Sequence, residues 1–113
     1  MANYCFVAPI LAGGVDRMHT LIKNEITNNA ASHDAFLRSA GMSREQVWIQ
    51  HTPMGDFAIV SYEVEDPAKT FSAIATSTHP YAVKFRNHLT AAHGIDFTKP
   101  MDMNERLLDW HAN

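Results

Sequence analysis

Residues 48–63, with the sequence WIQHTPMGDFAIVSYE, place two strand-like runs on either side of a short turn. With residues 52–55 in the turn, His51 faces Asp56 across an antiparallel ladder. The run FAIV does not alternate apolar with polar residues, as a strand does when one side of its sheet faces water. Both faces of this hairpin are therefore expected to be covered.

The same register sorts the hairpin side chains into two faces. One face is aliphatic and suits packing against helices: Val47, Ile49, Ala58, Val60 and Val64. The other face carries Trp48, Phe57 and Ile59 beside Gln50, Ser61 and Glu63. A chain of 113 residues has no elements left to cover this second face. Burying about 400 Å² of apolar surface is worth on the order of 10 kcal/mol before association costs, so we predict a homodimer packed sheet to sheet.

The first part of the chain predicts a strand, a helix and a second helical piece. Mixed apolar and aromatic residues at 3–8 are typical of a strand. Apolar residues then recur at helical spacing over 15–26. Poor helix formers at 27–32 predict a kink or break, with Ser32 capping a second piece that runs to Gly41.

The second half predicts two further helices and a last strand. Asp66 can cap free backbone amides, and Pro67 loses nothing at a first helical position. His79-Pro80 and Gly94 bracket another helix at 80–93. After a loop of roughly ten residues, ERLLDW at 105–110 is typical of a strand.

These elements give the order βαββαβ, with strands at 3–8, 47–51, 56–64 and 105–110. This is the split βαβ plan of the ferredoxin-like fold. We predict an α+β protein with a four-stranded antiparallel sheet and helices on one face, pairing through the other face as a dimeric α+β barrel.

Composition narrows the class of protein. The chain is 46% apolar and 19% charged, which fits one globular domain over residues 1–113. Its formal charge of −3, without clustered bases, argues against nucleic acid as a partner. We expect Cys5 to be a small buried hydrophobe, and the apolar start of the chain to be a mature strand rather than a signal peptide. No apolar run reaches the ~20 residues of a membrane span; we expect a cytoplasmic protein without membrane association.

The hairpin end offers a first candidate catalytic pair. An aspartate opposite a histidine can fix its tautomer and prepare it as a general base or acid, so His51 and Asp56 are candidate catalytic residues. Asp and His are also frequent in turns, so the alternative is that the pair only closes this one.

The helix at 80–93 offers a second candidate. Arg86 and His93 fall together on the border of its buried stripe. Arg86 could bind an anionic oxygen of a substrate, while His93 could move a proton. Alternatively, His93 only interacts with the helix dipole at the C-terminal end.

Three aromatic residues, Trp48, Tyr62 and Tyr81, are candidate substrate-binding residues that could line a pocket; the alternative is that they belong to the core. The chain has seven histidines, but their spacings do not match known zinc-binding patterns. His88 and His93, for instance, point about 140° apart on a helix. We therefore expect neither a metal nor another cofactor.

The segments VWIQHTPMGDFAIVSYE, HPYAVKFRNHLTAAHGID and LLDW resemble a family of uncharacterised small proteins of ferredoxin-like plan. More broadly, the chain resembles the dimeric α+β barrel superfamily, which includes antibiotic-biosynthesis monooxygenase-like proteins, sugar mutarotases and haem-degrading enzymes. The resemblance implies a homodimer with a small-molecule cavity between sheet and helices. It carries over no functional residue to a position of this chain.

Three functions remain open from the sequence. The first is an enzyme that transfers a proton on a small organic molecule without a metal. The second is a module that binds a ligand or partner without turning it over. The third, implied by the superfamily resemblance alone, is a cofactor-free or haem-dependent monooxygenase.

Overall fold

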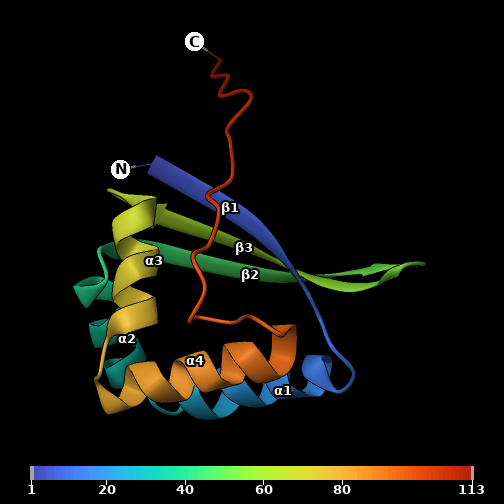
Figure 1. Ribbon diagram of the computed structural model, residues 1–113, viewed down its shortest axis with the longest axis vertical. Coiled ribbons are helices and arrows are strands. Elements are labelled where there is room, and N and C mark those ends of the chain that lie inside the picture. Colours follow the sequence, from blue (N-terminus) through green and yellow to red (C-terminus); the bar gives the residue numbers. More distant parts are fainter. Residues whose placement is uncertain (1, 113) are drawn as a thin grey trace.

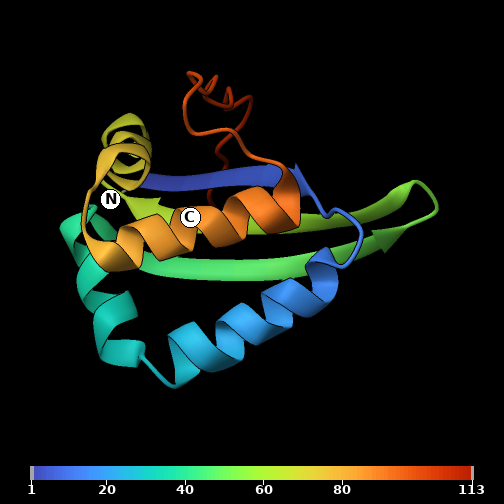
Figure 2. The same cartoon turned by 60° about the horizontal axis from the view of Figure 1, so that its bottom comes forward.

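The computed structural model describes residues 2–112, apart from the side chain of Glu25. Within them, a three-stranded antiparallel sheet in the order β1-β3-β2 is covered on one face by helices (Figures 1 and 2). The strands are β1 (Ala2–Pro9), β2 (Met42–Thr52) and β3 (Gly55–Val64). The helical segments are α1 (Gly14–Leu21), the π-helix η1 (Ile22–Thr27), α2 (Ala30–Ser39), α3 (Pro67–Thr76) and α4 (Pro80–His93). The α+β class is thus confirmed.

The predicted hairpin register is confirmed. His51 pairs with Asp56 and Trp48 with Ile59, although β2 begins five residues earlier than predicted. On the helix-facing side, Ala58, Val60, Tyr62 and Val64 are buried. On the outer side, Val7 is 61% and Trp48 is 50% exposed. The sheet therefore has the two apolar faces predicted from the sequence, and the described residues leave the outer face exposed to solvent.

Local capping explains where the later helices begin and end. The Asp66 side chain accepts a hydrogen bond from the Lys69 amide at the start of α3, as predicted. At the start of α4, the His79 ring accepts one from the Tyr81 amide. Gly94 ends α4 with a φ of 72°, a left-handed conformation that glycine adopts without steric cost.

The predicted break within residues 27–32 is confirmed, but Ser32 as the cap of the second piece is wrong. The helix restarts at Ala30, so Ser32 lies inside its first turn and its amide donates to the Asn29 carbonyl. The Asn29 side chain donates to the Asn24 carbonyl at 2.8 Å. This bond stabilises the short connection between η1 and α2, so α2 begins at Ala30, before the predicted cap at Ser32.

The C-terminal segment differs from the prediction. No strand is assigned at 105–110, so the fourth strand of a ferredoxin-like sheet is not formed among the described residues. The chain instead passes the free edge of β1, where side chains of Asn104 and Arg106 donate to the carbonyls of Cys5 and Asn3. Backbone carbonyls at the edge of β1 thus accept hydrogen bonds from side chains and not from the backbone of a neighbouring strand.

Cys5 also departs from expectation, because it is exposed rather than buried. It lies on β1, whose side chains alternate between the helix-covered face and the outer face, and position 5 belongs to the outer set with Val7. A strand that reads as apolar throughout therefore leaves half of its side chains uncovered in this chain.

The backbones of helices α1 and α4 come into direct contact at Gly14 and Ala92. A Cβ atom built on Gly14 would lie 2.8 Å from the Ala92 carbonyl oxygen, and the Leu11 amide donates to that same oxygen at 2.8 Å. The absence of a side chain at Gly14 is thus what lets the start of α1 rest against the end of α4.

Candidate functional site

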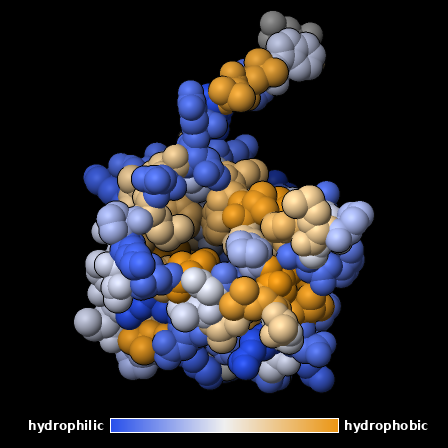
Figure 3. Space-filling model, turned by 45° about the vertical axis from the view of Figure 1, so that its right-hand side comes forward, coloured by the Kyte–Doolittle hydropathy of each residue, from blue (hydrophilic) through white to orange (hydrophobic). Residues whose placement is uncertain are grey.

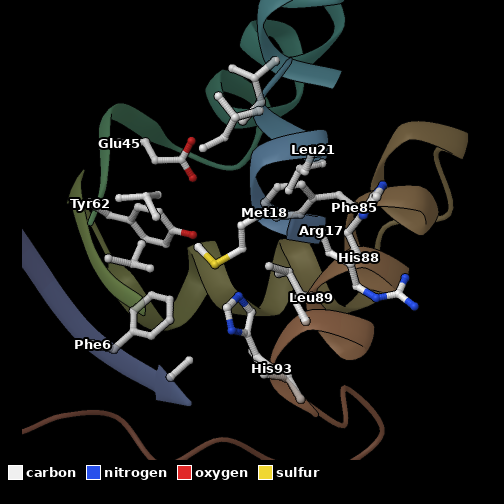
Figure 4. A pocket seen from close by; sticks show the side chains of 17 residues that line it. Phe6, Arg17, Met18, Leu21, Glu45, Tyr62, Phe85, His88, Leu89 and His93 are labelled. Carbon is white, nitrogen blue, oxygen red and sulfur yellow. The ribbon is translucent and has the colours of Figure 1, made fainter. Parts of the chain in front are cut away.

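A cavity lies between the helix-covered face of the sheet and the helices α1, η1 and α4 (Figure 4). Its enclosed interior has a volume of about 70 Å³, and the cavity with its open mouth about 700 Å³. That inner space holds several waters or one small organic group. The apolar lining residues are Phe6, Ala8, Met18, Leu21, Ile22, Ile26, Val47, Val60, Phe85, Leu89, Ala92 and Ile95.

His93 supplies one polar group of the cavity. Its side chain lines the cavity and the residue is 7% exposed (Figure 4). Nδ1 lies 2.9 Å from the Pro9 carbonyl oxygen, and since that oxygen can only accept, Nδ1 carries the hydrogen. In the neutral ring Nε2 is then left as a hydrogen-bond acceptor. The position just before Gly94 allows this contact, because α4 ends where β1 ends.

Tyr62 and Glu45 supply polar groups on the sheet side. Both side chains reach into the cavity from neighbouring strands (Figure 4). Burial, and secondly the Glu45 carboxylate, raise the pKa of the Tyr62 phenol above its ordinary value of 10.0. The hydroxyl therefore stays protonated at neutral pH, so that it can donate a hydrogen bond.

Glu45 is held by a buried hydrogen-bonded chain. Its Oε1 lies 3.0 Å from His33 Nε2, and His33 Nδ1 lies 2.6 Å from the Tyr81 hydroxyl. The His33 and Glu45 side chains are 9% and 14% exposed. Tyr81, predicted as an aromatic wall of the pocket, is a core residue that contacts Phe36 and Phe85 and supports the cavity through His33.

His51 and Asp56 are bonded at 2.7 Å, as the register predicted. Their side chains are 71% and 36% exposed. The hairpin that carries them projects beyond the helices (Figure 2), and the described lining of the cavity includes neither residue. The structure therefore separates this pair from His93.

Arg86 and Trp48 also lie outside the described cavity lining. Arg86 donates from one nitrogen to the carbonyls of Ile74 and Ser77, at 2.8 and 2.7 Å, which ties the end of α3 to α4. Trp48 lies on the outer face of the sheet. Of the candidate residues named from the sequence, the structure brings His93 and Tyr62 together in one cavity.

Sequence reasoning missed Glu45, Met18 and the π-helical wall. Glu45 lies outside the predicted strand, which begins at Val47, so strand periodicity does not place its side chain on the buried face. Met18 belongs to the apolar stripe of the first helix, which signals burial but not a cavity. The π-helix η1, which supplies Ile22 and Ile26, has no signature in the residues themselves.

Among residues 2–112 no group of three or more His, Cys, Asp or Glu side chains could hold a metal ion. In the same part of the chain, no helix has the length and apolar character needed to cross a membrane. Comparisons with protein-family models, with curated proteins and with solved structures find no match to this chain.

Proposed function

We propose that the protein binds a small, largely apolar organic molecule in the cavity between sheet and helices. The observation that carries this proposal is a largely apolar enclosure with a few polar groups: the His93 ring, the Tyr62 hydroxyl and the Glu45 carboxylate (Figure 4). Arg17 and His88 complete the lining. Such a combination is typical of ligand sites, where apolar walls supply affinity and a few polar groups fix orientation. The small inner volume favours a ligand with one ring or a short chain.

Titration with benzyl alcohol, followed by NMR of backbone amides, tests this proposal. Saturable shifts are expected at cavity residues such as Met18 and Leu89. Val47→Trp should fill the mouth and abolish these shifts, because Val47 lines the cavity at 39% exposure. Val83→Trp is the matched control, since Val83 is 40% exposed on α4 and is not among the cavity-lining residues. Shifts that do not saturate, or equal effects of both variants, would contradict ligand binding in the cavity.

A second candidate function is metal-free proton transfer on a bound carbonyl compound. The hydrogen bond from His93 Nδ1 to Pro9 favours it, because that bond orients Nε2 as the proton acceptor. Nε2 would take a proton from the carbon next to the carbonyl, and the Tyr62 hydroxyl would donate to the enolate oxygen. Return of the proton to carbon completes the cycle without an oxidant or reductant.

Exchange of the α-hydrogens of phenylacetone in D₂O, followed by NMR, tests proton transfer. His93→Asn places an amide nitrogen near the position of Nδ1 and removes Nε2, so exchange should fall to the uncatalysed rate while benzyl alcohol still saturates the cavity. Unchanged exchange in this variant would exclude His93 as the base. The haem-dependent version of the monooxygenase alternative is tested with hemin: the enclosed space of about 70 Å³ is too small for a porphyrin unless the walls move, so no Soret shift is expected.

For the quaternary structure, we propose a homodimer that packs through the outer face of the sheet. Support comes from the exposed side chains of Val7 and Trp48 and the half-buried side chains of Phe57 and Ile59 on one side of the sheet. Sedimentation equilibrium at micromolar concentration tests it. The mass should be twice 12.6 kDa, and a stable mass near 12.6 kDa would exclude the dimer.

A further inference from the structure

The C-terminal segment presents large apolar side chains to solvent. Leu107, Leu108 and Trp110 are 90%, 80% and 75% exposed. In the space-filling view, hydrophobic atoms sit on a stalk that projects from the body of the molecule (Figure 3). Scattered exposed apolar side chains are ordinary in proteins, but a run of this size on one short segment marks a surface that is covered in the functional state.

Hydrogen bonds fix where this segment leaves the sheet. The Asn104 amide donates to the Tyr4 hydroxyl at 2.7 Å, and its side chain donates to the Cys5 carbonyl at 2.8 Å. Arg106 donates to the Asn3 carbonyl at 2.7 Å. β1 is an edge strand, so these bonds hold the chain at the border of the sheet and direct the following residues away from it (Figure 1).

The same bonds work against return of the segment onto its own sheet. A ladder with β1 would need the carbonyls that the Asn104 and Arg106 side chains already engage. Beyond that point Asp109 pairs with Arg106 at 3.3 Å and with His111 at 3.0 Å. These contacts lie within the segment and hold it in a turn beyond the edge of β1. The apolar side chains therefore face outward from the protomer.

We propose that residues 105–112 of one protomer pack against the outer sheet face of a second copy, reciprocally, in the homodimer proposed above, on which this inference rests. Among the described residues, this segment and the face with Val7 and Trp48 are both uncovered apolar surfaces. A two-fold dimer covers both at once and leaves neither exposed. Area also favours it: a stable interface buries about 800 Å² per partner, and Trp110 alone offers roughly 150–250 Å² toward that sum.

The first test is the dimer dissociation constant, from sedimentation equilibrium. Leu107→Ser with Leu108→Ser should raise it at least about tenfold, because these side chains lose their apolar contacts. Met54→Ser with Val83→Ser is the matched control: it removes two exposed apolar side chains, 90% and 40% exposed, from the hairpin turn and from α4, and it should leave the constant within roughly threefold. Equal constants in both double variants would overturn the inference while the dimer itself stands, whereas a monomeric wild type would overturn the dimer.

The second test locates the segment. Protein labelled with ¹⁵N and lacking any tag is mixed with unlabelled Cys5→Ser/Ala112→Cys protein that carries a nitroxide at position 112. Broadening of the Val7, Trp48 and Ile59 amides in the ¹⁵N-labelled protomer is expected, because the tag then lies on the other chain. If broadening of these amides arises only when the nitroxide and ¹⁵N are in the same chain, the segment covers its own sheet and the inference fails.

Discussion

The Tyr81 hydroxyl and His33 Nδ1 lie 2.6 Å apart in the core, and the other ring nitrogen of His33 meets the Glu45 carboxylate at 3.0 Å. Since a carboxylate only accepts, Nε2 carries a hydrogen, and in the neutral ring the hydroxyl donates to Nδ1. This chain of bonds joins α4, α2 and β2 and fixes the carboxylate at the cavity wall. The polar end of the cavity is thus positioned by residues that belong to the core.

Tyr81→Phe should lower the free energy of unfolding by about 1–3 kcal/mol, because it leaves the buried His33 Nδ1 without this donor. Denaturation in guanidinium chloride, followed by circular dichroism, measures the change. Tyr4→Phe is the control: its hydroxyl accepts from the exposed Asn104 amide, which water can satisfy, so the loss should be under about 1 kcal/mol. Similar losses in both variants would show that the buried His33 contact adds no more stability than the exposed Asn104 contact.

Stability should fall at alkaline pH because of Tyr62. Its pKa in the folded protein is raised above 10.0 by burial and by Glu45, whereas the unfolded chain titrates near the ordinary value. Below pH ~10 both states hold the proton, so the contribution of this group is intact. Above it the unfolded state loses the proton first, and stability falls by up to about 1.4 kcal/mol per pH unit.

Comparison with Tyr62→Phe isolates this effect. Between pH 9 and pH 11 the wild type should lose more unfolding free energy than the variant. The phenolate absorbance of the folded wild type should match that of the variant over the same range and exceed it after unfolding. Phenolate absorbance from Tyr62 in the folded protein near pH 10 would contradict a raised pKa.

Replacement of Arg86 should destabilise the junction of α3 and α4. Arg86→Ala removes a charged donor from the carbonyls of Ile74 and Ser77, and a loss of about 1.5–3 kcal/mol in unfolding free energy is expected. Thermal and chemical denaturation measure it. If the variant keeps wild-type stability but loses affinity for benzoate, Arg86 is an anion-binding residue, as the sequence first indicated, and the structural role is excluded.

The His51–Asp56 bond should contribute little to stability, because both side chains lie at the projecting hairpin tip. A double-mutant cycle with His51→Ala and Asp56→Ala should give a coupling of about 0.2–1 kcal/mol, as for other exposed ion pairs. High salt should reduce it further. Loss of phenylacetone exchange in either single variant, with stability retained, would instead assign the pair to catalysis.

Elements set by local chemistry were predictable from the sequence. The turn residues between His51 and Asp56 fix the hairpin register, and Asp66 and Gly94 fix helix ends through capping and left-handed geometry. These features depend on residues within a few positions of one another. The placement of His93 and Tyr62 in a common cavity also follows from helix and strand periodicity once the register is known.

Features set by distant contacts were not predictable. The burial of Glu45 depends on His33, and the state of residues 105–110 depends on β1 at the other end of the chain. The composition of residues 105–110 is compatible with a strand. The side chains of Asn104 and Arg106, however, occupy the carbonyls of β1 that a strand would need, so the segment stays irregular in this chain. Exposure of Cys5 likewise depends on which side of the sheet the helices cover.

The backbone contact between Gly14 and Ala92 has a consequence for how a guest reaches the interior. Because Gly14 has no side chain, the start of α1 lies against the Ala92 carbonyl of α4, and the amide of Leu11, just before α1, donates to the same oxygen, so these contacts hold this end of the cavity together. The opposite wall, η1, has π-helical turns and exposes Ile22 to solvent at 42%. We therefore expect a molecule larger than the resting space to displace η1 rather than the start of α1, which the contacts at Gly14 hold in place.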